Sequence, residues 1–452
     1  MEQFVDSTLR KAAIEQSRRE TFDYTNKTDM LASIAAWMAK SDNYSPDKEA
    51  LRSQMKAYLD KRGLNADLDD LLKEFLNARI FVSKLESGVS FRYRGVLEYF
   101  IALRMAGDPD FKEWVLHDDR YLGYANEINY YAGKVRNDAS LIDIIADRYA
   151  EILAETLSEI GDIDLRDFED LRLPGDDKED DIDILSKQIV GPALSREERD
   201  AELEIDDEGY SDEAQDIVRA NLRDVSDKLA ASLFLYSGLI KNMELITDSE
   251  KRRHLSVIWR GWATILAISL RFAPRLAKDR RIRISNALYE VQAPQGMSDR
   301  VLLRKMLLLL PHIHIRLLTG ALGTEKLERQ LVEASFEEFD EPKITNFLRA
   351  GVISELRLDA TPSTIANLAT QLSENYYLLW SLVVHIGELR RMDRVKEEHF
   401  EKLEKPLAGA IADLRGGTPS ARADIKRQQL ARLAKDRLML SYKRKRDKKA
   451  GS

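Results

Sequence analysis

Apolar side chains recur at helical spacing in three successive stretches near the start of the chain. Residues 28–40 place Leu31 and Ile34 on one face, and spacings of three and four residues are typical of an amphipathic helix. Residues 45–61 and 66–77 repeat the same pattern. The sequence therefore predicts three consecutive helices.

After these stretches the apolar residues no longer recur at helical spacing but alternate along the chain. The alternating apolar residues are Ile80, Val82 and Leu85 before a turn at residues 86–88, and Val89, Phe91 and Tyr93 after it. Two alternating runs joined by a short turn predict a β-hairpin. Beyond Gly95 the helical spacing returns over residues 96–103. Three helices, a hairpin and a returning helix follow one another in the order of a winged helix, which we expect over residues 27–110.

The rest of the chain is predicted to be almost entirely helical. Residues 111–160 carry a dense aromatic stripe and are expected to form a helical extension packed on the winged helix. Later helical runs are predicted at about 212–241, 247–273, 275–292, 298–319, 323–337, 361–389, 395–413 and 419–441, separated mostly at Pro and Gly. The expected fold class is mainly α: an N-terminal winged helix with a small β-hairpin, followed by a multi-helix domain of helical hairpins at 212–441.

The net charge of −8 is unevenly distributed. Residues 160–213 carry 21 acidic and 6 basic side chains, whereas residues 422–449 carry 12 basic and 3 acidic ones. The acidic block also lacks apolar periodicity, so residues 161–211 are predicted to be a linker or mobile loop. Residues 442–452 are expected to be a basic, disordered tail, and residues 1–26 an N-terminal extension.

The composition indicates the cellular compartment of the protein. The chain has no cysteine, which excludes disulfides, thiolate metal sites and a cysteine nucleophile and fits a reducing cytoplasm. The first residues lack the basic and apolar regions of a signal peptide. The most apolar window, residues 261–273, is shorter than the roughly twenty residues that a membrane span needs. We therefore expect a cytoplasmic protein without a membrane partner.

The residues that carry chemistry in enzymes are sparse. No stretch has the Gly-x4-Gly-Lys-Ser/Thr pattern whose backbone amides cradle nucleotide phosphates. His312 and His314 are two residues apart, so on a helix they point in different directions, and no cysteine or nearby carboxylate completes a tetrahedral set. His385 is interpreted as a core or interface histidine. The sequence predicts no catalytic residue, no metal and no cofactor in this chain, and hence no enzyme.

Basic residues remain as candidates for contact with nucleic acid or an acidic partner. They are Arg92 and Arg94 in the hairpin region, Arg280, Arg281 and Arg283 after an apolar helix, and Lys443, Arg444, Lys445 and Arg446 near the end. In a DNA-binding winged helix, residues 66–77 would form the recognition helix. That segment carries four acids and one lysine, the wrong sign for approach to phosphates. A protein–protein role is therefore favoured over nucleic-acid binding.

One motif has a counterpart in a known family. The run VSFRYRGVLEYFIA at residues 89–102 resembles the F-R-H-x-x-x-x-E-Y-F-x-A signature that closes the winged helix of bacterial STAND/NACHT signalling ATPases. The matching residues are Phe91, Arg92, Glu98, Tyr99, Phe100 and Ala102. Tyr93 stands where related switches have a nucleotide-reading histidine, which makes it the candidate for cofactor contact. The resemblance extends over about residues 25–140.

The resemblance implies a winged helix plus helical sensor of a STAND/NACHT-type ATPase without the P-loop core. The helical region would recognise a trigger, in antiphage defence or stress signalling, and a protein partner and oligomerisation are expected. ATP or ADP would bind only together with a partner or with the missing ATPase core. Two alternatives stay open: a nucleic-acid-binding winged-helix protein that uses the hairpin and the basic tail, and an all-α scaffold or oligomerisation protein.

Overall fold

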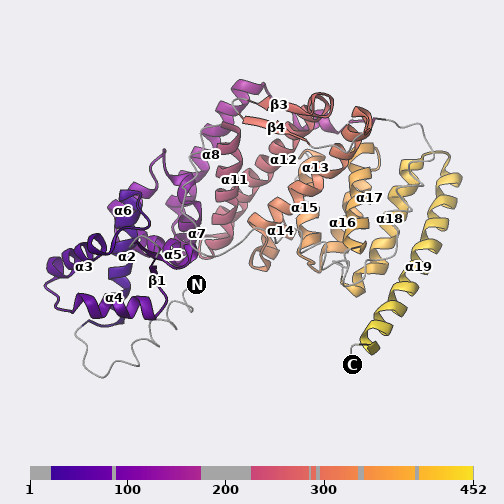
Figure 1. The fold of residues 1–452 in the computed structure, drawn as a ribbon. Coiled ribbons are helices and arrows are strands. Elements are labelled where there is room, and N and C mark those ends of the chain that lie inside the picture. The colour runs from indigo at the N-terminus through magenta and orange to yellow at the C-terminus, as the bar shows by residue number, and fades with distance from the viewer. Residues whose placement is uncertain are drawn as a thin grey trace. The chain divides into compact units, whose positions relative to one another are not determined.

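The protein contains two compact units, which are described separately. The computed structural model describes residues 22–83, 88–169, 171–174, 225–284, 287–291, 296–333, 341–391 and 396–450. Among these, the N-terminal unit holds the chain up to Ala139 together with Asn242–Leu245, and the helical unit holds the remainder. Figure 1 shows the elements of each unit in chain order. Both units are mainly helical, as the sequence predicts.

The N-terminal unit begins with three helices whose starts are fixed by aspartates. Its elements are α2 (Tyr24–Ser41), α3 (Lys48–Arg62), α4 (Leu68–Asn77), β1 (Phe81–Ser83), β2 (Val89–Phe91), α5 (Arg94–Gly107), α6 (Pro109–Val115), the 3-10 turn η1 (Tyr121–Tyr124) and α7 (Ala125–Val135). Asp23, Asp47 and Asp67 each accept a hydrogen bond from a backbone N–H in the first turn of α2, α3 and α4. Such caps satisfy donors that have no partner inside the helix.

The predicted hairpin lies between α4 and α5. Its strands are antiparallel and pair Phe81 with Phe91 and Ser83 with Val89. Aromatic rings connect the hairpin to the helices: the centroids of Phe75 and Phe81 are 5.8 Å apart, and those of Phe91 and Phe100 are 5.7 Å apart. All four rings are buried. The hairpin is therefore part of the core of this unit.

The helical unit is a succession of helices packed on their neighbours. Its elements are α8 (Ala139–Ile160), the 3-10 turn η2 (Leu165–Phe168), α11 (Val225–Asn242), α12 (Asp248–Asp279), β3 (Arg281–Ile284), β4 (Ala287–Glu290), α13 (Asp299–Leu322), η3 (Glu325–Leu327), α14 (Glu328–Glu333), α15 (Lys343–Glu355), α16 (Thr361–Gln371), α17 (Tyr376–Arg391), η4 (Glu397–His399), α18 (Phe400–Arg415) and α19 (Pro419–Ala450). Helix α13 packs on α12, α15 and α17, and α18 packs on α16, α17 and α19.

Helix α8 corrects one predicted boundary. We expected all of residues 111–160 to pack on the N-terminal domain, but from Ser140 onward α8 belongs to the helical unit. Tyr149 of α8 lies so close to Gly261 of α12 that a Cβ on that glycine would come within 2.3 Å of the tyrosine hydroxyl. The absence of a side chain at Gly261 is what lets the two helices approach.

The run predicted as a helix at 275–292 is instead the end of α12 followed by a β-hairpin. Helix α12 continues through Pro274 to Asp279, because buried side chains on both sides of the proline hold it against its neighbours. Arg280 then adopts a left-handed conformation with φ of 59°. The alternation of Arg and Ile over residues 281–284 suits a strand, and β3 pairs antiparallel with β4.

Two further predictions were wrong in the helical unit. The single helix expected at 361–389 is two helices, α16 and α17, because the Asn375 side chain accepts a hydrogen bond from Leu378 N–H and starts a new helix. Helix α15 (Lys343–Glu355) was not predicted, since Gly351 was interpreted as a break. A glycine inside a helix weakens it but does not end it when packing favours close approach.

The two charged segments also differ from expectation where the structure describes them. Residues 161–169 and 171–174 of the predicted acidic linker belong to the helical unit. There, Glu169 accepts a hydrogen bond from Lys343 N–H at 3.0 Å and also pairs with the Lys343 side chain. Residues 175–211 lie outside the described residues. The tail expected to be disordered continues α19 as far as Ala450. Lys and Arg have high helix propensity, and the helix dipole favours cations near a C-terminus.

One described helix, α12, is long and apolar enough to cross a membrane by length and composition. A second candidate exists only if α13 and α14, which meet at 89°, are counted as one span. Half of the apolar window in α12 is buried inside the protein, and the core helix of a soluble protein has the same composition. The helix contributes Trp259 and Trp262 to the core of its unit.

Candidate functional site

Strand β2 and helix α5 carry the sequence motif, and its residues lie in two environments. Phe91, Phe100 and Ile101 are buried in the core of the N-terminal unit. Glu98 and Tyr99 lie on the side of α5 that faces α7, and both are also largely buried. The aromatic members of the motif thus secure the hairpin and the helix, whereas Glu98 and Tyr99 contribute to a pocket.

Glu98 is held in place by two hydrogen bonds to one carboxylate oxygen. Its Oε1 accepts from Arg94 Nε at 2.8 Å, one turn earlier on α5, and from Asn126 Nδ2 of α7 at 2.9 Å. A carboxylate that is only 5% exposed needs such partners because it has lost most of its water. The bond to Asn126 ties α5 to α7 at the edge of the pocket.

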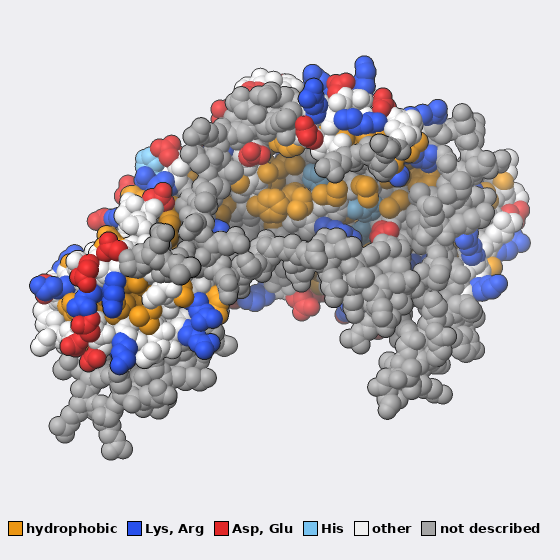
Figure 2. Space-filling model, viewed as in Figure 1, with side chains coloured by type: hydrophobic (Ala, Val, Ile, Leu, Met, Phe, Trp, Pro, Cys, Tyr) orange, Lys and Arg blue, Asp and Glu red, His pale blue; other side chains and the backbone are white. Residues whose placement is uncertain are grey.

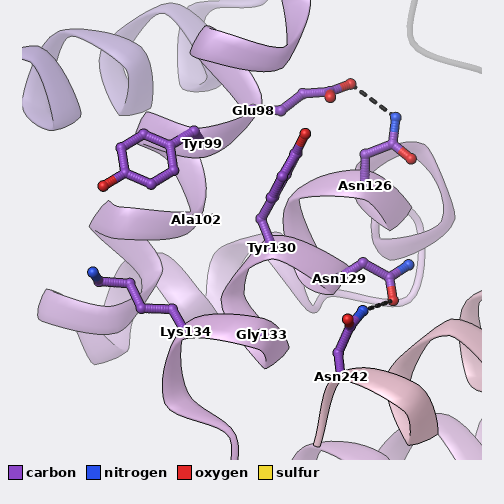
Figure 3. A pocket seen from close by; sticks show the side chains of 9 residues that line it. All are labelled: Glu98, Tyr99, Ala102, Asn126, Asn129, Tyr130, Gly133, Lys134 and Asn242. Atoms are coloured by element: carbon purple, nitrogen blue, oxygen red, sulfur yellow. Dashed lines mark hydrogen bonds between the residues drawn. The ribbon is translucent and has the colours of Figure 1, made fainter. Parts of the chain in front are cut away.

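The pocket between α5 and α7 has a volume of about 450 Å³, within the range of small-molecule sites. Its lining residues are Glu98, Tyr99, Ala102, Asn126, Asn129, Tyr130, Gly133, Lys134 and Asn242, all of them in the N-terminal unit. Figure 3 shows the Tyr130 ring in the middle of this lining, with the bonded Glu98 and Asn126 on one side and Lys134 on the other.

The pocket presents amide, aromatic and cationic groups suited to recognition. Asn242 donates a hydrogen bond to Asn129 at 3.2 Å, so two of its three amides hold each other. Tyr130 is 37% exposed and Lys134 is also exposed, so both residues of the lining reach solvent. These groups can receive a polar or anionic group beside an aromatic surface.

The predicted cofactor candidate, Tyr93, lies outside the pocket lining. It is the N-cap residue of α5, and the Arg92 guanidinium lies 5.3 Å from the centre of its ring. Arg94 is half exposed and bonded to Glu98. The structure therefore brings Arg94, Glu98 and Tyr99 to one site, while Arg92 and Tyr93 form a separate contact at the start of the helix.

The basic candidates of the helical unit do not form one cluster in the described residues. Arg280 pairs with Asp299 at 2.8 Å and donates to the carbonyl of Met297, so it fixes the return from β4 to α13. Arg281 is exposed on β3. Arg283 belongs to the same strand, but its side chain is outside the described part, as are those of Lys443, Arg444, Lys445 and Arg446 on α19.

Sequence reasoning missed one arrangement of histidines. His312 of α13 stacks on His385 of α17, with ring centroids 5.6 Å apart, and His385 Nε2 lies 2.7 Å from the Ser354 hydroxyl. Burial and the neighbouring His385 and Arg316 lower the pKa of His312 to about 3. His314 instead bonds to the Leu310 carbonyl of its own helix. The two rings meet across helices, so no spacing within the sequence signals the contact.

Three side chains of the types that bind metal ions lie close together near η4. Ligand atoms of Asp359, Glu398 and His399 lie within 4.8 Å of one another. Lys396 forms an ion pair with Asp359, and burial lowers the pKa of His399. Both carboxylates are exposed, and a lysine already compensates one of them. The group has the character of a surface ion-pair cluster.

The comparisons with known proteins associate the chain with STAND-type NTPases. A family model described as Novel STAND NTPase 4 matches residues 44–101. The matched segment runs from just before α3 into α5 and so includes α4, the β1–β2 hairpin and the Glu98–Tyr99 side of the pocket. No curated protein and no solved structure matches the chain.

Proposed function

We propose that the chain is a non-catalytic regulatory and sensor module of a STAND-type NTPase. In this proposal, residues 27–110 are a winged helix that relays a signal to a P-loop core, and the helical unit recognises a trigger. The setting would be antiphage defence or stress signalling in a bacterial cytoplasm. The observation that carries the proposal is the family match over residues 44–101, which falls on one packed set of elements.

Packing supports a relay more than DNA binding. The two described strands of the hairpin are held against α4 and α5 by ring contacts. The acids of α4 are also used within the unit: Asp69 pairs with Arg52 of α3, and Glu74 pairs with Lys27 of α2. A helix whose charges are acidic and internally paired offers little attraction to phosphates.

The pocket between α5 and α7 is the part of the N-terminal unit that we assign to contact with the NTPase core. It lies beside the matched segment, and Tyr130 and Lys134 of its lining are exposed. Exposed aromatic and cationic side chains around a concave site are favourable anchors for a partner protein. An acidic or carbonyl group of the core would fit between them.

Hydrolysis by the purified chain tests the non-catalytic part of the proposal. We expect release of phosphate from ATP to stay at the level of buffer, because the sequence contains no P-loop pattern. A second preparation with a STAND-type P-loop core supplied in trans shows whether turnover appears only in the pair. Robust turnover by the chain alone would overturn the proposal.

A pocket variant tests the association with the core. We expect Lys134→Glu to weaken binding to the P-loop core about tenfold, since a favourable contact becomes a repulsive one. Lys56→Glu is the matched control, because Lys56 is an exposed lysine of α3 in the same unit, outside the pocket lining. Isothermal titration measures both. Equal affinities for the two variants would remove the pocket from the interface, and no binding by the unaltered chain would remove the partner.

A further inference from the structure

Helix α13 carries several exposed apolar side chains. Val301, Leu309, Ile313 and Leu317 are 46%, 55%, 46% and 41% exposed. They occupy positions of a single four-residue repeat, in which Lys305 fills the remaining place. Side chains four residues apart on a helix lie one above the other. Each four-residue step turns about 40° around the helix axis, so Leu309, Ile313 and Leu317 span about 80° and share one face, whereas Val301 lies about 160° from Leu317. We call the face made by Leu309, Ile313 and Leu317 the α13 stripe.

The stripe is not needed for the core of the unit. Helix α13 already buries Leu307, Ile315 and Leu318 on another face. A helix that is apolar on several faces is ordinarily buried all round, yet here large side chains remain in contact with solvent. Single exposed apolar residues are common, but an aligned set marks an interaction surface.

Cations accompany the stripe. Lys305 lies four residues before Leu309, and Arg316 is exposed three residues after Ile313, so both are one turn from an apolar member. The nearby acid of α13, Asp299, is paired with Arg280. Figure 2 shows hydrophobic side chains gathered in a band over the middle of the helical unit, with Lys and Arg side chains above the band near β3 and β4. Arg281 of β3 is one of the exposed cations of the unit.

We propose that the α13 stripe binds an acidic amphipathic helix of a partner protein. From Leu309 to Leu317 the stripe is about 12 Å long at 1.5 Å per residue, which matches two to three turns of a partner helix. Such a helix would place apolar residues at intervals of three and four against Leu309, Ile313 and Leu317. Acidic residues on its flank would face Lys305 and Arg316 and set its orientation.

Charge favours this occupant over a second copy of the chain. Two α13 stripes packed together would bring the Lys305 and Arg316 side chains of both copies into the same contact, and like charges at an interface are unfavourable. An acidic partner instead neutralises them. The inference rests on the proposed role of the helical unit as the recognising part, and it adds the chemical class of the partner.

Two synthetic peptides provide the test. Both are 18 residues long and share leucines at intervals of three and four, but one has Glu and the other Lys on the flanks. Fluorescence anisotropy with the full chain measures each affinity. We expect the Glu peptide to bind at least about tenfold more tightly than the Lys peptide, because only the Glu peptide can pair with the cations of α13.

Three variants connect the binding to the stripe. Ile313→Asp should weaken the Glu peptide about tenfold, while Ile144→Asp, at an equally exposed apolar residue of α8, should leave its affinity unchanged. The double variant Lys305→Glu/Arg316→Glu should reverse the preference toward the Lys peptide. Circular dichroism confirms that each variant is folded. Reversal by charge exchange is a result that a mere loss of folding cannot produce.

Several outcomes would overturn the inference. Equal binding of both peptides, or binding that Ile313→Asp does not change, means that the stripe is not an acidic-helix site. Binding to vesicles containing phosphatidylserine but to neither peptide assigns the surface to lipid. A dimer that Ile313→Asp abolishes assigns it to self-association. If peptide binding fails while the chain still binds a P-loop core, only this inference fails and the proposed function stands.

Discussion

Lys27 and Glu74 form an ion pair inside the N-terminal unit, with 2.8 Å between Nζ and Oε1 and side chains only 2% and 6% exposed. The pair joins α2 to α4, two of the helices around the hairpin. Removing one partner leaves the other charge buried in a medium that solvates it poorly. We expect Lys27→Ala to lower the free energy of unfolding of this unit by about 3–5 kcal/mol, measured by urea denaturation.

An exposed pair and an apolar replacement serve as controls for this prediction. Lys56 and Asp60 are 68% and 67% exposed, so Lys56→Ala should change the free energy of unfolding by less than about 0.5 kcal/mol. The double variant Lys27→Met/Glu74→Leu should recover most of the loss, since no charge is left unpaired. A loss for Lys27→Ala no larger than for Lys56→Ala would contradict the buried-pair argument.

His312 makes the helical unit sensitive to acid. Its pKa is about 3 in the folded protein against 6.5 for an unperturbed histidine, so below pH 6.5 the unfolded chain takes up a proton that the folded chain does not. The contribution to stability is present above pH 6.5 and is lost as pH falls toward 3, at about 1.4 kcal/mol per pH unit. The burial-lowered pKa values of His254 and His314 act with the same sign.

Replacing the ring isolates this effect. His312→Phe keeps an aromatic ring against His385 but cannot take up a proton. We expect the decrease in unfolding free energy between pH 7 and pH 5 to be smaller in this variant by about 2 kcal/mol. Urea denaturation at both pH values measures the difference. An unchanged decrease would show that His312 is protonated in the folded chain at pH 5.

At the scale of elements, the sequence predicted correctly the helices and strands that residues close together in the chain determine. The β1–β2 hairpin follows from alternation, and the buried face of α5 follows from helical spacing, so both lie where the sequence predicts them. The aromatic and acidic residues of the motif were also identified beforehand. What failed were the ends of elements, such as α12 at Pro274 and the start of α17 at Asn375, because tertiary packing and a single side-chain cap decide them.

The pocket between α5 and α7 also combines residues that a local pattern identifies with residues that only tertiary packing brings together. Glu98 and Tyr99 were singled out by the motif. Asn126, Tyr130 and Lys134 lie in the aromatic segment that was expected to pack on the winged helix, but their place in a pocket follows only from the packing of α7 on α5. The His312–His385 contact likewise joins residues far apart in the chain. Single-sequence reasoning therefore finds residues with a local pattern and misses partners supplied by another helix.

Close approach of α13 and α15 gives a prediction at this scale. A Cβ at Gly351 of α15 would lie 2.4 Å from Ile315 Cδ1 and 2.5 Å from Cγ1. We expect Gly351→Ala to lower the free energy of unfolding by about 1–3 kcal/mol through overpacking. Gly320→Ala is the matched control, because that position on α13 has no atom within 4 Å of an added Cβ. It should stabilise by about 0.5–1 kcal/mol, and thermal denaturation should show the two variants moving in opposite directions.

At the scale of the whole molecule, the two units have separate hydrophobic cores. The ring cluster around Phe75, Phe81 and Phe91 belongs to the N-terminal unit, whereas Trp259 and Trp262 belong to the helical unit. The proposed roles follow this division, since the relay and the sensor would reside in different cores. Such a module transmits a signal only if each unit stays folded while the conformation of the other unit changes.

The division predicts that the two units unfold as separate cooperative transitions, and unit-specific variants test this. Lys27→Ala should lower the midpoint of one calorimetric transition and leave the other within about 1 °C, because the lost ion pair lies in one core only. Gly351→Ala should lower the midpoint of the second transition and leave the first within about 1 °C, since its clash with Ile315 lies in the core of the helical unit. The variants themselves assign the transitions, because Lys27 lies in the N-terminal unit and Gly351 lies in the helical unit. If either variant shifts both transitions together, the chain folds as one cooperative body, and a relay between independent units would have to give way to a single rigid module.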